Sequence, residues 1–202
     1  KLEGMQGAKI DPLKDPEKAT LRDQYRFEYL MARQNTGEAQ LMAAKTFKNP
    51  SKDGKALLEK SLAEMVELSE KYDNYIIGAS AFHKRGDIER LLGQKDKAIE
   101  SYTRMLEQGE VDSLREPQIG ATIGLIKLAL EEDPPKYQDA IKQGEEFEKS
   151  LRPNEKRLAI SQELRIELAK AFIAKSKDEK NNKPNERTRA TSDARQLLLS
   201  AR

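Results

Sequence analysis

The feature that most constrains this chain is a set of small residues at fixed places in the charged stretch 86–102. Gly86 and Gly93 are separated by two turns of helix, Ala98 follows, and Tyr102 comes one turn after the alanine. Two helices approach closely only where a side chain is nearly absent, so Gly86 and Ala98 are expected at a helix–helix contact. Gly93 can take the left-handed conformation that ends a helix. The stretch therefore predicts a tight helical hairpin.

The rest of the chain also has the spacing of helices. Apolar residues recur every three or four positions, and no segment alternates as a strand does. Breaks at Asn49-Pro50, at Asp133-Pro134-Pro135 and at Pro153 separate short segments, which favours antiparallel neighbours. We expect an all-α fold with about eight helices.

Two expectations concern the start of the chain. Residues 1–14 hold glycine and proline without periodicity and are interpreted as a linker or loose end. Asp15-Pro16-Glu17 predicts a helix start, followed by one long helix or by two that break at Gly37.

Residues 15–202 are then expected to form a single helical domain. Because the chain begins with a lysine and ends in a helical pattern, we interpret it as a piece of a longer protein.

Two further signals concern helix ends in the second half. Ser113 and Glu116 have the spacing of a capping box, in which each side chain satisfies a backbone N–H at a helix start. The polar segment 176–191 is expected to be partly a loop, and Ser192 is expected to cap a last helix.

The composition suits an elongated stack of amphipathic helices better than a compact ball. Of the 202 residues, 37% are hydrophobic and 36% are charged, so every helix keeps a wide polar face. The net charge is only +2, which gives no reason to expect nucleic acid as a partner. There is no cysteine, and no apolar run approaches the roughly 18 residues that span a bilayer. No cofactor and no metal are expected.

The segment 79–109 resembles a tetratricopeptide repeat. Phe82 fills the family's first aromatic place, Gly86 its glycine, and Ala98 with Tyr102 the small-to-aromatic pattern of the second helix. The resemblance implies a right-handed solenoid of about four antiparallel helical hairpins that binds a protein or peptide partner on its concave face.

The resemblance has departures. Arg85 stands where leucine is usual, and Glu89 where an aromatic is usual. A weaker match covers 124–147, and a third begins at Ser192. The matching alanines, at 98, 140 and 194, are spaced unevenly and wider than the family's 34 residues.

The resemblance also implies which residues face a partner. On the first helix of the best repeat, and on the matching helix of the next, these are Ser80, His83, Lys84, Asp87, Arg90, Leu125 and Leu128. The alternative for the polar residues is an ordinary solvated helix face, and the alternative for the leucines is the core. Asp87 would repel a terminal carboxylate, which excludes the carboxylate clamp of some family members.

Catalytic interpretations find little support. His83 is the only histidine, and no cluster of cysteine or carboxylate accompanies it in the sequence. Gly120-x-x-x-Gly124 lacks the surroundings of a phosphate loop and is interpreted as a close helix contact. The basic segment 175–202 lacks aromatic stacking partners for nucleic acid.

We therefore expect a protein interaction scaffold and not an enzyme. The alternative is a structural spacer or oligomerisation domain of a larger bacterial envelope protein, with self-association. The style of repeat resembles that of such proteins, so the periplasm or cell envelope is the expected compartment, with the cytoplasm as the alternative.

Overall fold

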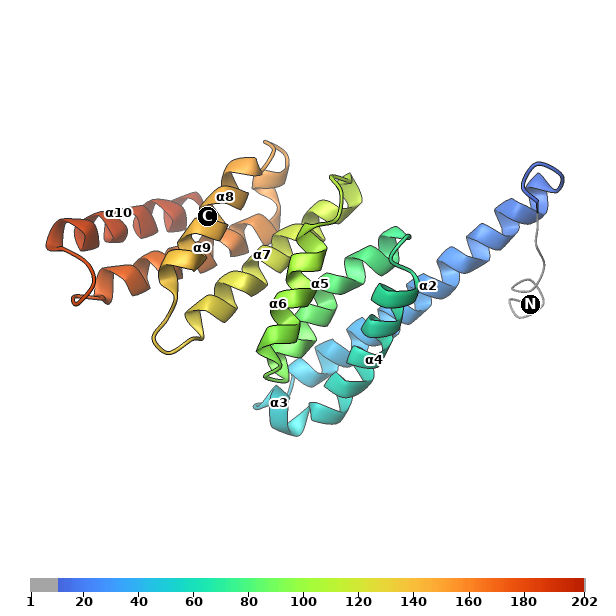
Figure 1. Cartoon of the computed structure of the whole chain (residues 1–202), viewed down its shortest axis with the longest axis horizontal. Coiled ribbons are helices and arrows are strands. Elements are labelled where there is room, and N and C mark those ends of the chain that lie inside the picture. Colours follow the sequence, from blue (N-terminus) through green and yellow to red (C-terminus); the bar gives the residue numbers. More distant parts are fainter. Residues whose placement is uncertain (1–10, 202) are drawn as a thin grey trace. The chain divides into compact units, whose positions relative to one another are not determined.

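The computed structural model describes residues 11–201, and most of that range is helical (Figure 1). Within it there are nine α-helices, two short 3-10 helices and no strand, which confirms the all-α prediction. The chain divides after Ala81 into two compact units, and each is described by itself. Most of the expected linker lies outside the described residues. Its last part, residues 11–14, forms a turn in which the Asp15 N–H bonds to the Asp11 carbonyl at 2.9 Å.

The first unit is built on one long helix and a shorter one beside it. Its elements are α2 (Pro16–Lys45), α3 (Pro50–Asp53), α4 (Lys55–Lys71) and the beginning of α5 (Ile76–Leu91). The predicted start of α2 is confirmed, with Pro16 at the first helical position and Glu17 in the first turn. Of the two alternatives for this segment, the structure has the single helix, which continues through Gly37.

Gly37 allows α2 and α4 to pack closely. A Cβ atom at this position would lie 2.5 Å from Met65 Cε, and the Ser61 hydroxyl donates to the Gly37 carbonyl at 2.7 Å. Nearby, Arg33 Nε on α2 donates to Glu64 Oε2 on α4 at 2.6 Å. The glycine therefore marks a helix contact and not a break.

The second unit consists of successive helices that pack on their neighbours. After the remainder of α5 come α6 (Lys95–Leu106), a 3-10 turn (Asp112–Leu114), α7 (Arg115–Leu130), α8 (Tyr137–Ser150), a second 3-10 turn (Glu155–Arg157), α9 (Ala159–Lys177) and α10 (Pro184–Ser200). From α6 onward each helix contacts the next, and α7 also packs on α9.

Two of the predicted helix starts are wrong. The Ser113 capping box is replaced by a 3-10 turn, and α7 begins after Leu114 without a side-chain cap. The last helix begins at Pro184, so Ser192 lies inside it. Packing explains the second error, because Ala190 and Ala194 are buried in a cluster with α9 and hold this polar segment as a helix.

The predicted reversal at Gly93 is confirmed. Gly93 has φ of 74°, and its N–H donates to the Arg90 carbonyl at 3.0 Å. The next N–H, of Gln94, donates to the Glu89 carbonyl at 2.8 Å. These two bonds form a Schellman motif, which satisfies the last carbonyls of α5 and turns the chain into α6.

The centre of the α5–α6–α7 contact is the ring of Tyr102. A Cβ atom at Gly86 on α5 would lie 2.6 Å from this ring, and one at Gly124 on α7 would lie 2.1 Å from it. One turn earlier on α7, a Cβ at Gly120 would lie 2.2 Å from the His83 ring. Gly120 and Gly124 therefore make the close helix contact that their spacing predicted.

We predict that Gly124→Ala destabilises the protein by about 2 kcal/mol, because the added methyl group overlaps a rigid, buried ring, and alanine's helix preference only partly offsets this. Urea unfolding monitored by circular dichroism measures the change. Gly109→Ala is the matched control, since nothing lies within 4 Å of a Cβ there and its φ is not positive. A Gly124→Ala protein as stable as the control would contradict this account of the packing.

Candidate functional site

A groove open to solvent lies between α6, α7 and α8, with a volume of about 410 Å³; we call it the first groove. Leu106, Leu125 and Phe147 contribute partly exposed apolar surface from three different helices. Its polar lining residues are Thr103, Thr122, Gln143, Glu146 and Ser150. The first groove can therefore bury an apolar side chain and offer hydrogen bonds to its neighbours.

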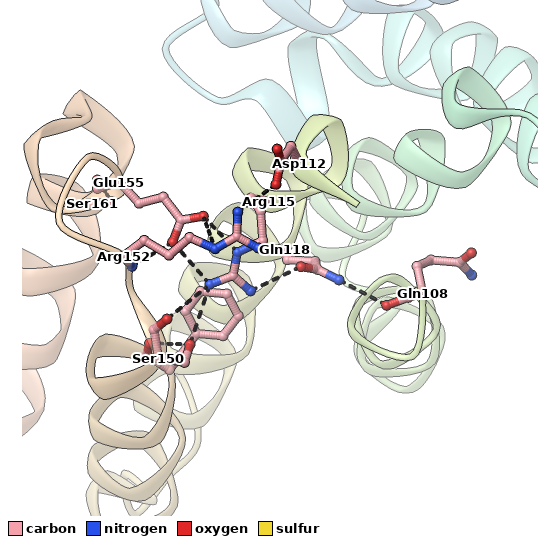
Figure 2. A network of polar contacts seen from close by, with 9 residues as sticks. Gln108, Asp112, Arg115, Gln118, Ser150, Arg152, Glu155 and Ser161 are labelled. Atoms are coloured by element: carbon pink, nitrogen blue, oxygen red, sulfur yellow. Dashed lines mark hydrogen bonds and ion pairs between the residues drawn. The ribbon is translucent and has the colours of Figure 1, made fainter. Parts of the chain in front are cut away.

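Beside the first groove, the buried guanidinium of Arg115 organises a polar network (Figure 2). Arg115 Nε and Nη2 donate to the two carboxylate oxygens of Glu155 at 3.0 and 3.2 Å. The guanidinium carbon lies 5.1 Å from the centroid of the Phe147 ring, and Nη2 also donates to the Ser150 carbonyl at 3.4 Å. Arg115 thus fixes two of the residues that line the groove.

The same network reaches α6. Arg115 Nη1 donates to Gln118 Oε1 at 3.3 Å, and Gln118 Nε2 donates to the Gln108 carbonyl at 3.0 Å. Gln108 follows the last turn of α6, so the chain of bonds in Figure 2 ties three successive helices together at one end. These bonds leave the walls of the first groove little freedom to move relative to one another.

Glu155 is charged when the protein is folded at neutral pH. Its hydrogen bond with Arg115 is the main cause that holds the pKa of this carboxyl below its usual range, against the opposing effect of burial. The backbone N–H of Arg152 also donates to Glu155 Oε2, at 2.8 Å, and the Arg152 side chain pairs with Asp112. The loop between α8 and α9 is therefore anchored by charge to the start of α7.

A second groove lies between α8, α9 and α10, with a volume of about 390 Å³. Its apolar lining comes from Leu168, Phe172 and Leu197. Its polar lining residues are Glu145, Glu148, Lys149, Asp193, Gln196 and Ser200. α8 thus lines both grooves, and each faces a different flank of that helix.

The two grooves are built from equivalent positions of the chain, and we call this shared set of positions the groove frame. Five lining positions of the second groove stand 50 residues after lining positions of the first. The pairs are Thr122 with Phe172, Gln143 with Asp193, Glu146 with Gln196, Phe147 with Leu197, and Ser150 with Ser200. Arg165, which is buried like Arg115, has the same spacing from it and donates to the Ser200 carbonyl at 3.3 Å. Each groove is therefore bordered by a buried arginine bonded to the end of the following helix.

Of the residues predicted to face a partner, Leu125 lines the first groove, and the other six line neither of the two grooves described. Leu128 is 3% exposed and belongs to the buried apolar residues. Ser80, in the first unit, donates its hydroxyl to the Ile77 carbonyl at 2.9 Å, and Lys84 is half-buried.

The other three predicted residues lie together on α5 and take part in packing. His83 is buried, with its ring against Gly120, and its Nε2 is 3.8 Å from Asp87 Oδ2. Asp87 accepts a 2.8 Å hydrogen bond from the Tyr102 hydroxyl. Arg90 Nη1 donates to Glu131 Oε1 at 2.6 Å.

Arg115, Glu155 and the second groove were not predicted from the sequence. The signal that could have found Arg115 and the second groove is the spacing of 50, which recurs in the arginines and in Ser150 and Ser200, whereas no such signal marks Glu155. The uneven alanine spacing concealed it, because Ala140 was matched to Ala194. At a spacing of 50 the partner of Ala140 is Ala190, and both are buried.

Within residues 11–201, no group of three or more His, Cys, Asp or Glu side chains is arranged to hold a metal ion. Over the same residues, no helix combines the length and the apolar character needed to cross a bilayer. No protein-family model, curated protein or solved structure matches the chain. The geometry and chemistry of the two grooves are therefore the basis on which we infer a function.

We predict that Glu155→Gln lowers the free energy of unfolding at neutral pH by about 3 kcal/mol, because Arg115 is left buried without its counter-charge. The folded pKa of Glu155 lies below the unfolded value of about 4.3, so the carboxylate stabilises the protein above that value. This contribution is lost as the pH falls through the folded pKa. Urea unfolding between about pH 7 and about pH 3 should show the two proteins converging in acid.

The control for this prediction is Glu107→Gln, which neutralises an exposed carboxylate. It should change the unfolding free energy by less than about 0.5 kcal/mol at either pH. If the unfolding free energy of Glu155→Gln stays below that of the unchanged protein by the same amount at every pH, the charge of Glu155 is not what stabilises the protein.

Proposed function

We propose that this chain is a non-catalytic protein–protein interaction scaffold of the tetratricopeptide-repeat type, whose second unit docks a segment of a partner protein. The observation that carries the proposal is the recurrence of one groove frame at a spacing of 50 residues. A binding surface that repeats with the helices is typical of repeat proteins, in which each unit stacks on its neighbours.

In this proposal the pairs α5/α6, α7/α8 and α9/α10 are hairpins stacked as a right-handed solenoid. The succession of contacts from α6 to α10, with α7 on both α8 and α9, supports this. So does the place of Gly86 and Tyr102 at the contact between α5 and α6, which is where the repeat family has its small and aromatic residues. The repeat of 50 residues is longer than the family's usual 34, so this is a divergent, long-helix version.

The first groove is the docking site that we favour for the partner. Its apolar residues Leu106, Leu125 and Phe147 are partly exposed, whereas Asp87 and Arg90 on α5 are engaged with other helices. The Arg115 network holds the groove walls in place before any partner binds. Binding therefore costs little additional conformational entropy in these walls. The partner segment is expected to insert an apolar side chain between α6 and α8.

The test is site-specific photocrosslinking in cells that make the protein naturally. With p-benzoylphenylalanine in place of Leu125, we expect one dominant covalent adduct with another protein, because that side chain faces the docked segment. A second change, Leu106→Glu, should remove this adduct by placing a charge in the apolar groove, while the circular dichroism spectrum stays the same.

Ile166 is the matched control position, since it is an aliphatic residue of α9, 38% exposed, that lines neither groove. The photoreactive residue there should give no such adduct. No adduct at position 125, or an adduct that survives Leu106→Glu, would refute docking in the first groove.

A further inference from the structure

The second groove repeats the frame of the first with different chemistry. Its floor is apolar, since Leu168 and Phe172 are only 1% and 5% exposed and Leu197 is partly exposed beside them. The position of the first groove that corresponds to Phe172, 50 residues earlier, holds the polar Thr122. The second groove therefore has an aromatic ring in its floor where the first has a hydroxyl.

The rims differ in charge. The lining of the second groove includes three carboxylates and one ammonium, from Glu145, Glu148, Asp193 and Lys149. The lining of the first groove has a single carboxylate, that of Glu146, and no lysine or arginine. Both linings are thus net negative, and the second carries the larger negative charge.

Each of the three carboxylates has one basic side chain within 4.0 Å, and two of these cations are held only weakly. Lys149 Nζ is 3.8 Å from Glu145 Oε2, and Arg189 Nε is 3.9 Å from Asp193 Oδ2. Both are i,i+4 pairs whose basic side chains are 74% and 86% exposed, and such exposed pairs are weak because solvent screens them. They can give way to a cation that a partner places over the groove.

The third cation, Arg165, is held differently. Its Nη2 lies 3.4 Å from Glu148 Oε1, while Nη1 donates to the carbonyls of Lys156 and Ser200 at 3.1 and 3.3 Å. With 7% of its side chain exposed, Arg165 lies behind the lining and fixes Glu148 at the rim. The geometry of this carboxylate is therefore set before binding, as Phe147 is set by Arg115 in the first groove.

We infer that the second groove is a charge-selective binding site for a partner segment that carries an apolar side chain next to lysine or arginine. This rests on the proposed function, since it assigns a chemistry to the partner. The apolar side chain packs on Leu168, Phe172 and Leu197, and the basic side chain reaches Glu145 and Asp193 at the rim. An acidic segment, or the phosphates of a nucleic acid, would meet like charge at the same rim.

The experiment uses the whole chain and two synthetic peptides as probes. Both place leucines at helical spacing, and they differ only in having lysines or glutamates beside the leucines. Heteronuclear NMR titrations measure both affinity and location. The lysine peptide should perturb the signals of Leu168, Phe172 and Leu197, and should bind at least about tenfold more tightly than the glutamate peptide. Its affinity should fall as salt is added.

Charge-reversed variants give the control. Asp193→Lys should weaken the lysine peptide and strengthen the glutamate peptide by about tenfold each. Glu100→Lys makes the same change in charge at an exposed position of α6 that lines neither groove, and it should leave both affinities within about twofold.

Three outcomes would overturn this inference. They are equal affinity for the two peptides, perturbations confined to the first groove, and no binding of either peptide. None of these outcomes would contradict docking in the first groove, which the Leu125 photocrosslink tests separately. Conversely, a selective response in the second groove without a Leu125 adduct would uphold the charge-selective site and refute docking in the first groove.

Discussion

The arrangement of the second unit depends on the contact of one aromatic ring with two glycines. The Tyr102 ring fills the space that side chains at Gly86 and Gly124 would otherwise occupy, so α5, α6 and α7 meet around it. Its hydroxyl donates to Asp87, and burial is the main cause that raises the pKa of this phenol, which keeps it neutral. Because α7 lines the first groove, this ring also sets the position of the groove's floor relative to α6.

The first residue of α7, Arg115, is held by charge. A buried ion pair is not by itself a source of net stability, since two ions must be desolvated. The Arg115–Glu155 pair is instead placed where it determines geometry. One guanidinium touches the ring of Phe147, the end of α8 and the loop before α9. Apolar packing at Tyr102 and ionic contacts at Arg115 therefore fix α7 at two points, and the first groove lies along the helix they fix.

The sequence was sufficient for what is local and insufficient for what joins distant segments. Gly93 and the small residues around it predicted the α5–α6 hairpin, because a reversal and a close contact demand those residue types. The departures from the repeat pattern at Arg85 and Glu89 were not explained by the family pattern. In the structure they pair with each other, since Arg85 Nε donates to Glu89 Oε1 at 2.8 Å, and Ser101 on α6 donates to the same buried carboxylate. Arg115 and Glu155, 40 residues apart, meet only once three helices have packed.

In the proposed function, one frame serves two specificities. The buried arginine and the end of the following helix recur at 50 residues, and they build the walls. The positions between them differ, with Thr122 replaced by Phe172 and Gln143 by Asp193. In the proposed second site the aromatic ring adds apolar surface at this position of the floor, and the carboxylate would repel acidic segments, so selectivity would come from exclusion as much as from attraction. Since α8 lines both grooves, a segment that occupies one comes within a helix width, about 10 Å, of the other. Two weak anchors on one partner would then act as a bivalent ligand, with an affinity that neither groove reaches alone.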